Sequence, residues 1–588
     1  MNETQNQRSK DSLDYRIRIA SLNRHQSIHS QVMHINNGDE KSSINYAMSF
    51  TKGLEHNPET GLVQNAETCE ALIDAINGGE ISPFHAIDVP TAEGKRRLWE
   101  APTAGFVFDV QGPDAQEVTM APPPGLGSSE LTFEMAEVYE LAVLRDTALN
   151  KFSELSDEIA GPCERLNKLS YAMRGFCGRP RLTAKNACGD KVLTPGTVFR
   201  GSSPGVGIGP YLSCFMLMGG GNTKSSVESG LINYGAQTIN QKVPKASDKN
   251  FMLEFDEWVA VQNGYSRNNT PKTGTGNYEE NSGELKLTFI KTPRDLATYV
   301  HFDALYQAYL NACLILLSQK ESQDFAPFDS NFVNLSGEFP NSRAGGFALF
   351  GGPHILSLVT EVATRALKAV RYQKFQVHRR LRPEVLAARI AKSKNEAFKA
   401  AVGGAASTNF ENMKADLSDT LAKINELFHT EDLLPMAFAE GSPMHPSYGA
   451  GHATVAGACV TVLKAFFDTN AQLARKGESV CFVKPEIAER DNWQPVKIVA
   501  TDNDDTLTIE DSDEVITLEA ELNKLAANIS IGRNMGGVHF FSDYYDSLRM
   551  GEEIALGILK DQAESYPYDA FTLSVKTFDG DEKLITRS

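Results

Sequence analysis

Apolar residues recur every three or four positions through much of the second half of the chain, which is the spacing of one face of an α-helix. The stretches 293–319 and 354–381 keep this spacing over many turns, and each is predicted to be a long helix. Residues 453–467, "ATVAGACVTVLKAFF", are small or apolar almost throughout. Their length and composition predict a buried helix in the centre of a bundle.

The first half of the chain is less regular. Residues 128–152 have helical periodicity and begin with a serine and an early glutamate, which predicts an N-cap, and residues 67–79 predict a helix that ends at a glycine. Glycine and proline loops separate these helices. Residues 1–50 are polar and are expected to form an arm that is ordered only by packing on another surface.

Two segments favour β structure. Residues 479–515 predict a short β-hairpin insertion, and residues 570–588 predict two strands joined by an Asp-Gly turn. The polar, Gly- and Asn-rich residues 264–284 predict a surface loop near a boundary. The expected fold is therefore mainly α with small β additions. We expect an N-terminal helical and loop-rich region, 1–290, for packing and oligomer contacts, and a helical-bundle region, 291–588.

Composition narrows the classes of function. Over 588 residues, 41% hydrophobic and 22% charged content are typical of a globular protein, and the formal net charge is −18. That charge disfavours general binding to nucleic acid or to anionic membranes. No apolar run reaches the roughly 20 residues of a membrane span, and "MNETQNQRSK" lacks the apolar segment of a secretory signal. We therefore expect no nucleic-acid or membrane partner, and a cytoplasmic or undetermined location.

The eight cysteines form no CxxC pair, which disfavours a zinc ribbon or a thioredoxin-type site. They are expected to be reduced and mostly buried. Cys177 and Cys188 are the two that could pair in an oxidising compartment.

The first candidate for chemistry is "HPSYGAGHATVAGA", residues 445–458. Glycines allow a sharp turn before the apolar helix, so that His452 is predicted to lie at a helix N-terminus. Unpaired N–H groups and the positive end of the helix dipole suit an oxyanion there.

The second candidate is the basic run "RYQKFQVHRRLRP", residues 371–383. Lys374 and Arg382 are predicted to lie near one another around a helix that Pro383 ends at Arg382. Taken alone, such a run is more often a solvated helix face.

The third candidate lies within residues 530–559. A pair of glycines breaks the helical pattern, so Arg533 is predicted to end one helix and His539 to lie near the start of the next. His539 and Asp543 are four apart, where the carboxylate can fix the orientation of the imidazole. Taken alone, this pair is more often a structural hydrogen bond.

Together these segments supply the parts of a cage for a phosphate-like ion, because arginine and lysine neutralise tetrahedral oxyanions and backbone N–H groups complete the contacts. The members of the predicted cage are Lys374, Arg382, Arg533, the Gly451 N–H, His452 and His539.

The three segments resemble the signature of the vanadium-dependent haloperoxidases, a family that shares its plan with the class A acid phosphatases and the lipid phosphatases. The resemblance covers roughly residues 290–565. The seven residues between Lys374 and Arg382, and His445 at the start of the glycine turn, are similar to bromoperoxidases of the red-algal and cyanobacterial type. The implied fold is the helical bundle of haloperoxidases and acid phosphatases.

The resemblance implies a role for each residue. His539 would be the vanadium ligand, oriented by Asp543, and His452 would be the acid–base residue, assisted in catalysis by Lys374 and His445. Four groups would bind the vanadate oxygens, namely Lys374, Arg382, Arg533 and the Gly451 N–H. Three residues would border the halide pocket, namely His445, Gln373 and Phe375.

The implied enzyme oxidises bromide or iodide, with chloride left open, by means of hydrogen peroxide and a vanadate cofactor. The hypohalous acid that it releases halogenates an organic acceptor. The resemblance also implies a large homo-oligomer, a dodecamer, and allows a structural calcium ion whose ligands the sequence does not place.

Ala450 departs from the family, where a serine usually precedes the glycine and histidine of this turn. A hydroxyl that hydrogen-bonds a charged oxyanion contributes roughly 1.5–3 kcal/mol. We expect a working enzyme with altered vanadate binding or halide preference.

Two alternatives use the same cage. The first is an acid-phosphatase-like phosphomonoesterase with His452 or His539 as the nucleophile; the Lys374–Arg382 spacing and His445 argue against it. The second is a non-enzymatic oligomer that binds an oxyanion. Ala450 favours this alternative only weakly.

Overall fold

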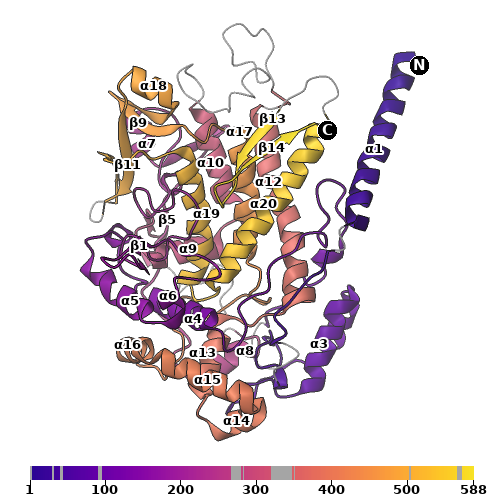
Figure 1. Ribbon diagram of the computed structural model, residues 1–588, viewed down its shortest axis with the longest axis vertical. Coiled ribbons are helices and arrows are strands. Elements are labelled where there is room, and N and C mark those ends of the chain that lie inside the picture. Colours follow the sequence, from indigo (N-terminus) through magenta and orange to yellow (C-terminus); the bar gives the residue numbers. More distant parts are fainter. Residues whose placement is uncertain are drawn as a thin grey trace.

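A computed structural model shows a mainly helical protein built around a bundle of long helices (Figure 1). The structure describes residues 3–29, 32–39, 44–90, 96–265, 280–281, 284–319, 347–349, 351–501, 505–565 and 572–587. The predicted surface loop at 264–284 lies mostly outside the described residues.

Helix α17, Gly451–Phe466, lies in the centre of the bundle. It packs against α12 (Gly352–Tyr372), α19 (Leu518–Met535) and α20 (Phe541–Glu564). Nearly all of its side chains are buried, as the run of small and apolar residues predicted. The central helix of the bundle therefore begins directly after the glycine turn.

Two glycines let α17 and α20 approach closely. A Cβ atom at Gly457 would lie 2.0 Å from the Leu548 carbonyl oxygen, and one at Gly551 would lie 2.0 Å from the Thr454 carbonyl oxygen. No side chain fits at such separations, so the two backbones cross in contact. This crossing fixes α20 relative to the helix that follows the glycine turn.

The predicted helix at 293–319 is two helices. Helix α9, Pro293–Phe302, and helix α10, Gln307–Ser318, meet at an angle of 98°. Helix α9 starts with a capping box between Thr292 and Asp295 and ends at the C-cap residue Asp303. The single-helix prediction was wrong because the apolar periodicity continues across the bend.

The N-terminal region contributes to the same core. Helix α4, Ser129–Val143, starts at the predicted N-cap Ser128 and contacts α19 and α20. Helix α3, Ala66–Gly78, ends at Gly79 in the left-handed conformation, as predicted. Helix α1, Glu3–His29, extends beyond the main body in Figure 1 and contacts α20 through Tyr15 and Arg18.

The described part of the chain has nine further α-helices, of 4 to 13 residues. They are α5 (Asp157–Asn167), α6 (Ser170–Met173), α7 (Lys224–Glu228), α8 (Phe255–Gln262), α13 (Pro383–Lys392), α14 (Glu396–Val402), α15 (Gly404–Asp416), α16 (Ser418–Phe428) and α18 (Pro485–Arg490). Figure 1 shows α13 to α16 at the end of the molecule opposite the C-terminus.

The β structure is more extensive than the predicted hairpin. Strands β9 (Gln472–Lys476), β10 (Ser479–Val483), β11 (Gln494–Ala500) and β12 (Leu507–Asp511) form a four-stranded antiparallel sheet in the order β10-β9-β11-β12. The predicted C-terminal pair is confirmed as β13 (Thr572–Lys576) and β14 (Glu582–Thr586).

The other described strands are short pairs. They are β1 (Ala184–Lys185) with β2 (Lys191–Val192), β3 (Leu231–Tyr234) with β4 (Gln237–Asn240), β5 (Val243–Pro244) with β8 (Leu287–Thr288), and β6 (Glu280–Asn281) with β7 (Glu284–Leu285).

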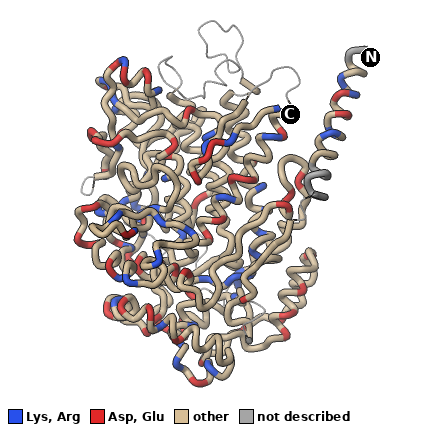
Figure 2. Tube along the Cα trace, viewed as in Figure 1, with Lys and Arg blue, Asp and Glu red and all other residues tan. Residues whose placement is uncertain are grey.

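Lysines and arginines lie among acidic residues along the chain and are not gathered on one side (Figure 2). In the described residues no single helix is long and apolar enough to cross a membrane, although the bent pair α9 and α10 passes that test by length and composition. All eight cysteines are free, and only Cys177 and Cys188 are exposed.

Candidate active site

Lys374 lies just beyond α12, in a π-helical turn, Gln373–His378. Its side chain is completely buried, and its Nζ donates to the carbonyl oxygens of Pro446 at 2.7 Å and Ser447 at 2.9 Å. These bonds bring the basic segment against the glycine turn that precedes α17. The first two predicted segments therefore meet at Lys374.

Arg382 does not end a helix but caps the start of one. The chain reverses at Arg379, which has a φ of 42°, and Arg382 is the N-cap residue of α13, with Pro383 in its first turn. Proline suits the first turn of a helix as well as it ends one. The prediction of one helix face carrying both Lys374 and Arg382 was therefore wrong, although both residues reach the same site.

The Arg382 guanidinium connects all three segments. Its Nη1 donates to the Val538 carbonyl oxygen at 2.7 Å and lies 3.0 Å from His539 Nε2. Its Nη2 lies 2.8 Å from His445 Nδ1, and its Nε donates to the His445 carbonyl oxygen. The structure thus brings Arg382, His445 and His539 together, as the sequence predicted.

His539 precedes α20 and is fixed by the first turn of that helix. Its Nδ1 lies 2.7 Å from Asp543 Oδ2, which also accepts the backbone N–H of Phe540. The expected pairing of His539 with Asp543 is confirmed, although His539 itself is outside the helix. With Nδ1 engaged, Nε2 is the nitrogen that faces Arg382 and can act as a ligand.

Arg380 holds the other oxygen of Asp543, a contact that the sequence did not predict. Arg380 Nη1 donates to Asp543 Oδ1 at 2.8 Å, and its Nη2 lies 3.2 Å from Glu134 Oε2 on α4. All three side chains are buried. Glu134, in the N-terminal region, thus helps to orient His539 through Arg380 and Asp543.

The glycine turn delivers His452 to the first turn of α17, as predicted. Ala450 is the N-cap residue, with extended backbone and no side-chain hydrogen bond, and its own N–H donates to Ser547 Oγ at 2.7 Å. His452 Nε2 lies 3.1 Å from Asp303 Oδ1. Asp303 was missed because the bend between α9 and α10, which carries it, was not predicted.

Arg533 and Gly451 each lie at the end of a bundle helix. Arg533, in the last turn of α19, donates from Nη1 to the Val300 carbonyl oxygen at 2.8 Å, while its Nε is buried without a hydrogen-bond partner in the described part of the chain. Gly451 is the first residue of α17.

Burial and the repulsion between neighbouring positive charges disfavour the charged forms of the lysine, arginine and histidine side chains in the cage. Burial, followed by the positive charges of neighbouring arginines, holds the pKa of Lys374 well below its usual range. Burial lowers the pKa of Arg382 to about 9 and that of Arg533 to about 10. For His539, burial and the charges of Arg382 and Lys374 hold the pKa well below its usual range. A multivalent anion would relieve this repulsion.

Gln373 and Phe375 make contacts away from these residues. The Gln373 amide donates to the Val118 carbonyl oxygen at 2.9 Å. The Phe375 ring is buried in a small apolar cluster with N-terminal side chains such as Leu54 and Cys69. The structure thus joins His445 to the cage but does not join Gln373 or Phe375 to it.

The donor set suits an oxyanion better than a bare cation. Arg382 lies at His539 Nε2, the charges of Lys374 and Arg533 also act on that ring, and the unpartnered Nε of Arg533 is a spare donor. The residues present therefore fit vanadate. Within the described ranges no group of three or more His, Cys, Asp or Glu side chains could hold a metal ion, so the calcium site stays a prediction.

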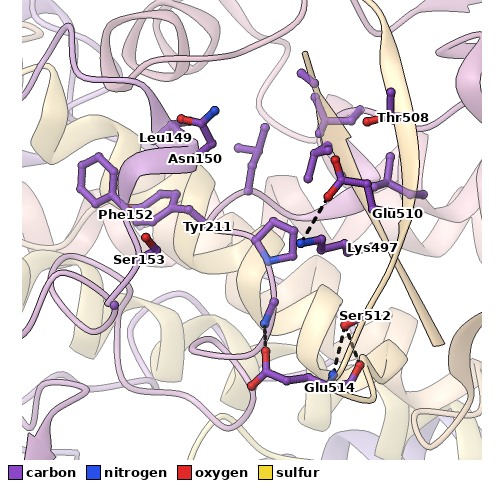
Figure 3. A pocket seen from close by; sticks show the side chains of 18 of the residues that line it. Leu149, Asn150, Phe152, Ser153, Tyr211, Lys497, Thr508, Glu510, Ser512 and Glu514 are labelled. Atoms are coloured by element: carbon purple, nitrogen blue, oxygen red, sulfur yellow. Dashed lines mark hydrogen bonds and ion pairs between the residues drawn. The ribbon is translucent and has the colours of Figure 1, made fainter. Parts of the chain in front are cut away.

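A cavity of about 840 Å³ lies elsewhere in the molecule, along β11, β12 and the loops near residues 150 and 210 (Figure 3). Phe152 and Tyr211 line it, and Lys497 pairs with Glu510 across strands β11 and β12. None of the predicted site residues lines this cavity. The candidate site is instead the buried cage.

Known proteins are similar to this chain in fold and in sequence. A family model described as the VCPO second helical-bundle domain matches residues 355–565. The homohexameric second vanadate-dependent bromoperoxidase of Ascophyllum nodosum has a similar fold, with a TM-score of 0.76 and 24% identity over 99% of this chain and 90% of that chain.

Sequence similarity extends over almost the entire chain. The vanadium-dependent bromoperoxidase of Corallina officinalis is 38% identical over 97% of this chain and 98% of the relative. A vanadium-dependent bromoperoxidase of Ascophyllum nodosum is 30% identical over 97% of this chain and 92% of the relative. With such similarity over nearly the full length of both proteins, the chain belongs to the vanadium-dependent haloperoxidase family.

Proposed function

We propose that this protein is a vanadate-dependent bromoperoxidase that oxidises bromide or iodide with hydrogen peroxide. In the reaction, peroxide, halide and one proton give hypohalous acid and water, and the hypohalous acid halogenates an organic acceptor. The observation that carries the proposal is the position of Arg382, which lies within hydrogen-bonding distance of both His539 Nε2 and His445 Nδ1. One guanidinium thus links the candidate vanadium ligand to the candidate halide side.

Each cage residue has a task in this proposal. Lys374, Arg382, Arg533 and the Gly451 N–H would hold the vanadate oxygens, and His539 Nε2 would be the vanadium ligand, with Asp543 keeping the ring oriented. Bound vanadate would supply a Lewis acid that activates peroxide without changing oxidation state. Lys374 would withdraw charge from the reacting oxygen, because a buried cation acts strongly in a site from which water is excluded.

His452 would hold and move the proton. Asp303 engages its Nε2, so Nδ1 is the nitrogen left to exchange a proton with a reacting oxygen. Burial lowers the pKa of His452, opposed by the carboxylate of Asp303. The lowered pKa favours the neutral imidazole, which is the form that accepts a proton.

The proposal is tested by halogenation of a phenolic dye with peroxide and bromide. Chelator-treated protein is assayed before and after addition of orthovanadate, with phosphate as a competitor. We expect activity that requires vanadate and that phosphate suppresses. Hydrolysis of p-nitrophenyl phosphate without any halogenation would instead support the phosphomonoesterase alternative.

Restoring a hydroxyl at residue 450 is expected to tighten vanadate binding. Ala450 has extended backbone, with φ −89° and ψ 121°, which serine adopts without strain. One hydrogen bond to a charged group corresponds to roughly tenfold in affinity, so Ala450→Ser should lower the vanadate concentration for half-maximal reconstitution about tenfold.

The matched control for this substitution is Ala405→Ser on an exposed position of α15. The control should leave reconstitution unchanged. A higher melting temperature of Ala450→Ser without tighter vanadate binding would show that the new hydroxyl caps α17 and does not reach the cofactor.

We also propose that the protein forms a homo-oligomer. Large apolar side chains are exposed on α1, at Leu13 and Ile17, and on the loop before α4, at Phe108 and Val110. The similar bromoperoxidase of known structure is homohexameric. These exposed groups support contacts made by the N-terminal region, 1–290, while the dodecamer stays a prediction.

A further inference from the structure

Glu100 belongs to a loop, residues 96–106, that is fastened over the turn at 440–445. The Glu100 N–H donates to the Met444 carbonyl oxygen at 3.1 Å. The Arg97 guanidinium donates to two further carbonyl oxygens of the same turn, each at 3.1 Å. The loop therefore places the Glu100 side chain beside the residue that follows Met444, which is His445.

The Glu100 carboxylate lies between two buried groups at the end of the cage. Its Oε2 is 3.7 Å from Arg371 Nη2 and 3.6 Å from His445 Nε2. The Glu100 side chain is 42% exposed, whereas those of Arg371 and His445 are 13% and 9% exposed. Among these three groups, Glu100 is the most exposed to solvent.

The Arg371 guanidinium has N–H groups that are free to bind an anion. Its distance to Glu100 is that of an ion pair without a hydrogen bond, and its Nη1 is buried without a partner among the described residues. Burial lowers its pKa, and the charge of Glu100 opposes that effect. A buried guanidinium with an unpaired N–H favours an additional anion.

Arg371 also belongs to the electrostatic surroundings of the cage. It lies three residues before Lys374 in the chain, and its charge contributes to lowering the pKa of Lys374 and of His445. A halide that approaches the cage beside His445 therefore meets Arg371, and it meets the negative charge of Glu100 at the same place.

We infer that Glu100 sets the affinity for halide, because its carboxylate, held in place by the loop, lies between Arg371 and His445, where a halide would also bind. The inference rests on the proposed function and concerns how tightly that enzyme binds its halide substrate. Two like charges about 5 Å apart near a protein surface repel strongly, and solvent screening at a half-exposed carboxylate reduces the effect to about tenfold in affinity.

The test compares Glu100→Gln, which keeps the shape and removes the charge, with Glu100→Asp, which keeps the charge. Glu80→Gln on an exposed position is the control, because it changes the net charge equally. The vanadate-loaded enzymes are assayed for KM and kcat with bromide. Bromide binding to the vanadate-free proteins is measured from the quadrupolar broadening of the bromide NMR signal.

We expect Glu100→Gln to lower KM for bromide about tenfold, with the gain in KM and not in kcat, and to broaden the bromide signal more than wild type does. Glu100→Asp should not show this gain, and Glu80→Gln should match wild type. An unchanged or higher KM for Glu100→Gln, together with unchanged broadening, would overturn the inference. Absence of halogenation by wild type would count against the proposed function, while the bromide signal would still decide the role of Glu100.

Discussion

Replacement of His539 by alanine is expected to abolish vanadate-dependent halogenation, with a loss of about 10³-fold or more at vanadate concentrations that saturate wild type. Loss of one preorganised hydrogen-bond donor at a reacting oxygen costs about 10²–10³-fold, and loss of the ligand to the metal should cost at least as much. His539 is the histidine whose Nε2 faces Arg382 while Asp543 holds its Nδ1.

The variant should remain folded. Asp543 would still accept hydrogen bonds from Arg380 and from the Phe540 N–H, so removal of the imidazole leaves no unpaired buried charge. His85→Ala is the matched control, because His85 is exposed on a 3-10 turn far along the chain from the cage. Circular dichroism and the melting temperature check the fold of both variants.

Binding measurements separate the ligand role from a general role in the cage. Vanadate binding, followed by vanadium NMR, should be lost in His539→Ala. Phosphate binding should weaken far less, because Lys374, Arg382 and Arg533 hold its oxygens and it forms no bond to the histidine. Wild-type affinity of the variant for vanadate would show that another residue is the vanadium ligand.

The parts of the site that depend on local chain geometry were predictable from the sequence. Gly449 and Gly451 mark the turn, and the run of small residues after them predicts the buried helix α17, so the position of His452 follows from neighbouring residues. The pairing of His539 with Asp543 follows from a separation of four residues, which brings side chains together at a helix start as well as inside a helix.

The direction of the chain around Pro383 was not predictable in the same way. Proline is compatible with both the end of one helix and the first turn of the next. The chain reverses at Arg379 in a left-handed conformation, and no glycine in the sequence marks that position. The bend between α9 and α10, residues 303–306, likewise lacks a proline or glycine. Local propensity therefore did not show either change of direction.

Contacts between distant segments were beyond the sequence patterns. Glu134 lies on α4, whereas the arginine that it pairs with, Arg380, follows α12. Glu100 reaches Arg371 and His445 only because its loop is fastened to the turn at 440–445. Tertiary packing creates these pairs, and no periodicity within one segment specifies them.

Replacement of His452 by alanine is the second large effect that we expect, and it should appear in kcat. Proton transfer by a positioned side chain contributes about 10²–10⁴-fold, so kcat should fall by that factor at saturating vanadate, peroxide and bromide. Vanadate affinity should change much less, because Lys374, Arg382 and His539 remain in place.

Asp303→Asn tests the same proton route without removing the imidazole. Asp303 Oδ1 lies 3.1 Å from His452 Nε2, and the loss of such an orienting carboxylate typically costs about 10–100-fold. Stopped-flow measurement of the reaction with peroxide, at fixed bromide, would show whether both variants slow the same step. If kcat of His452→Ala equalled that of wild type, the proton would have to enter by another route, and the exposed carboxylate of Glu100 beside His445 would then be the next group to replace.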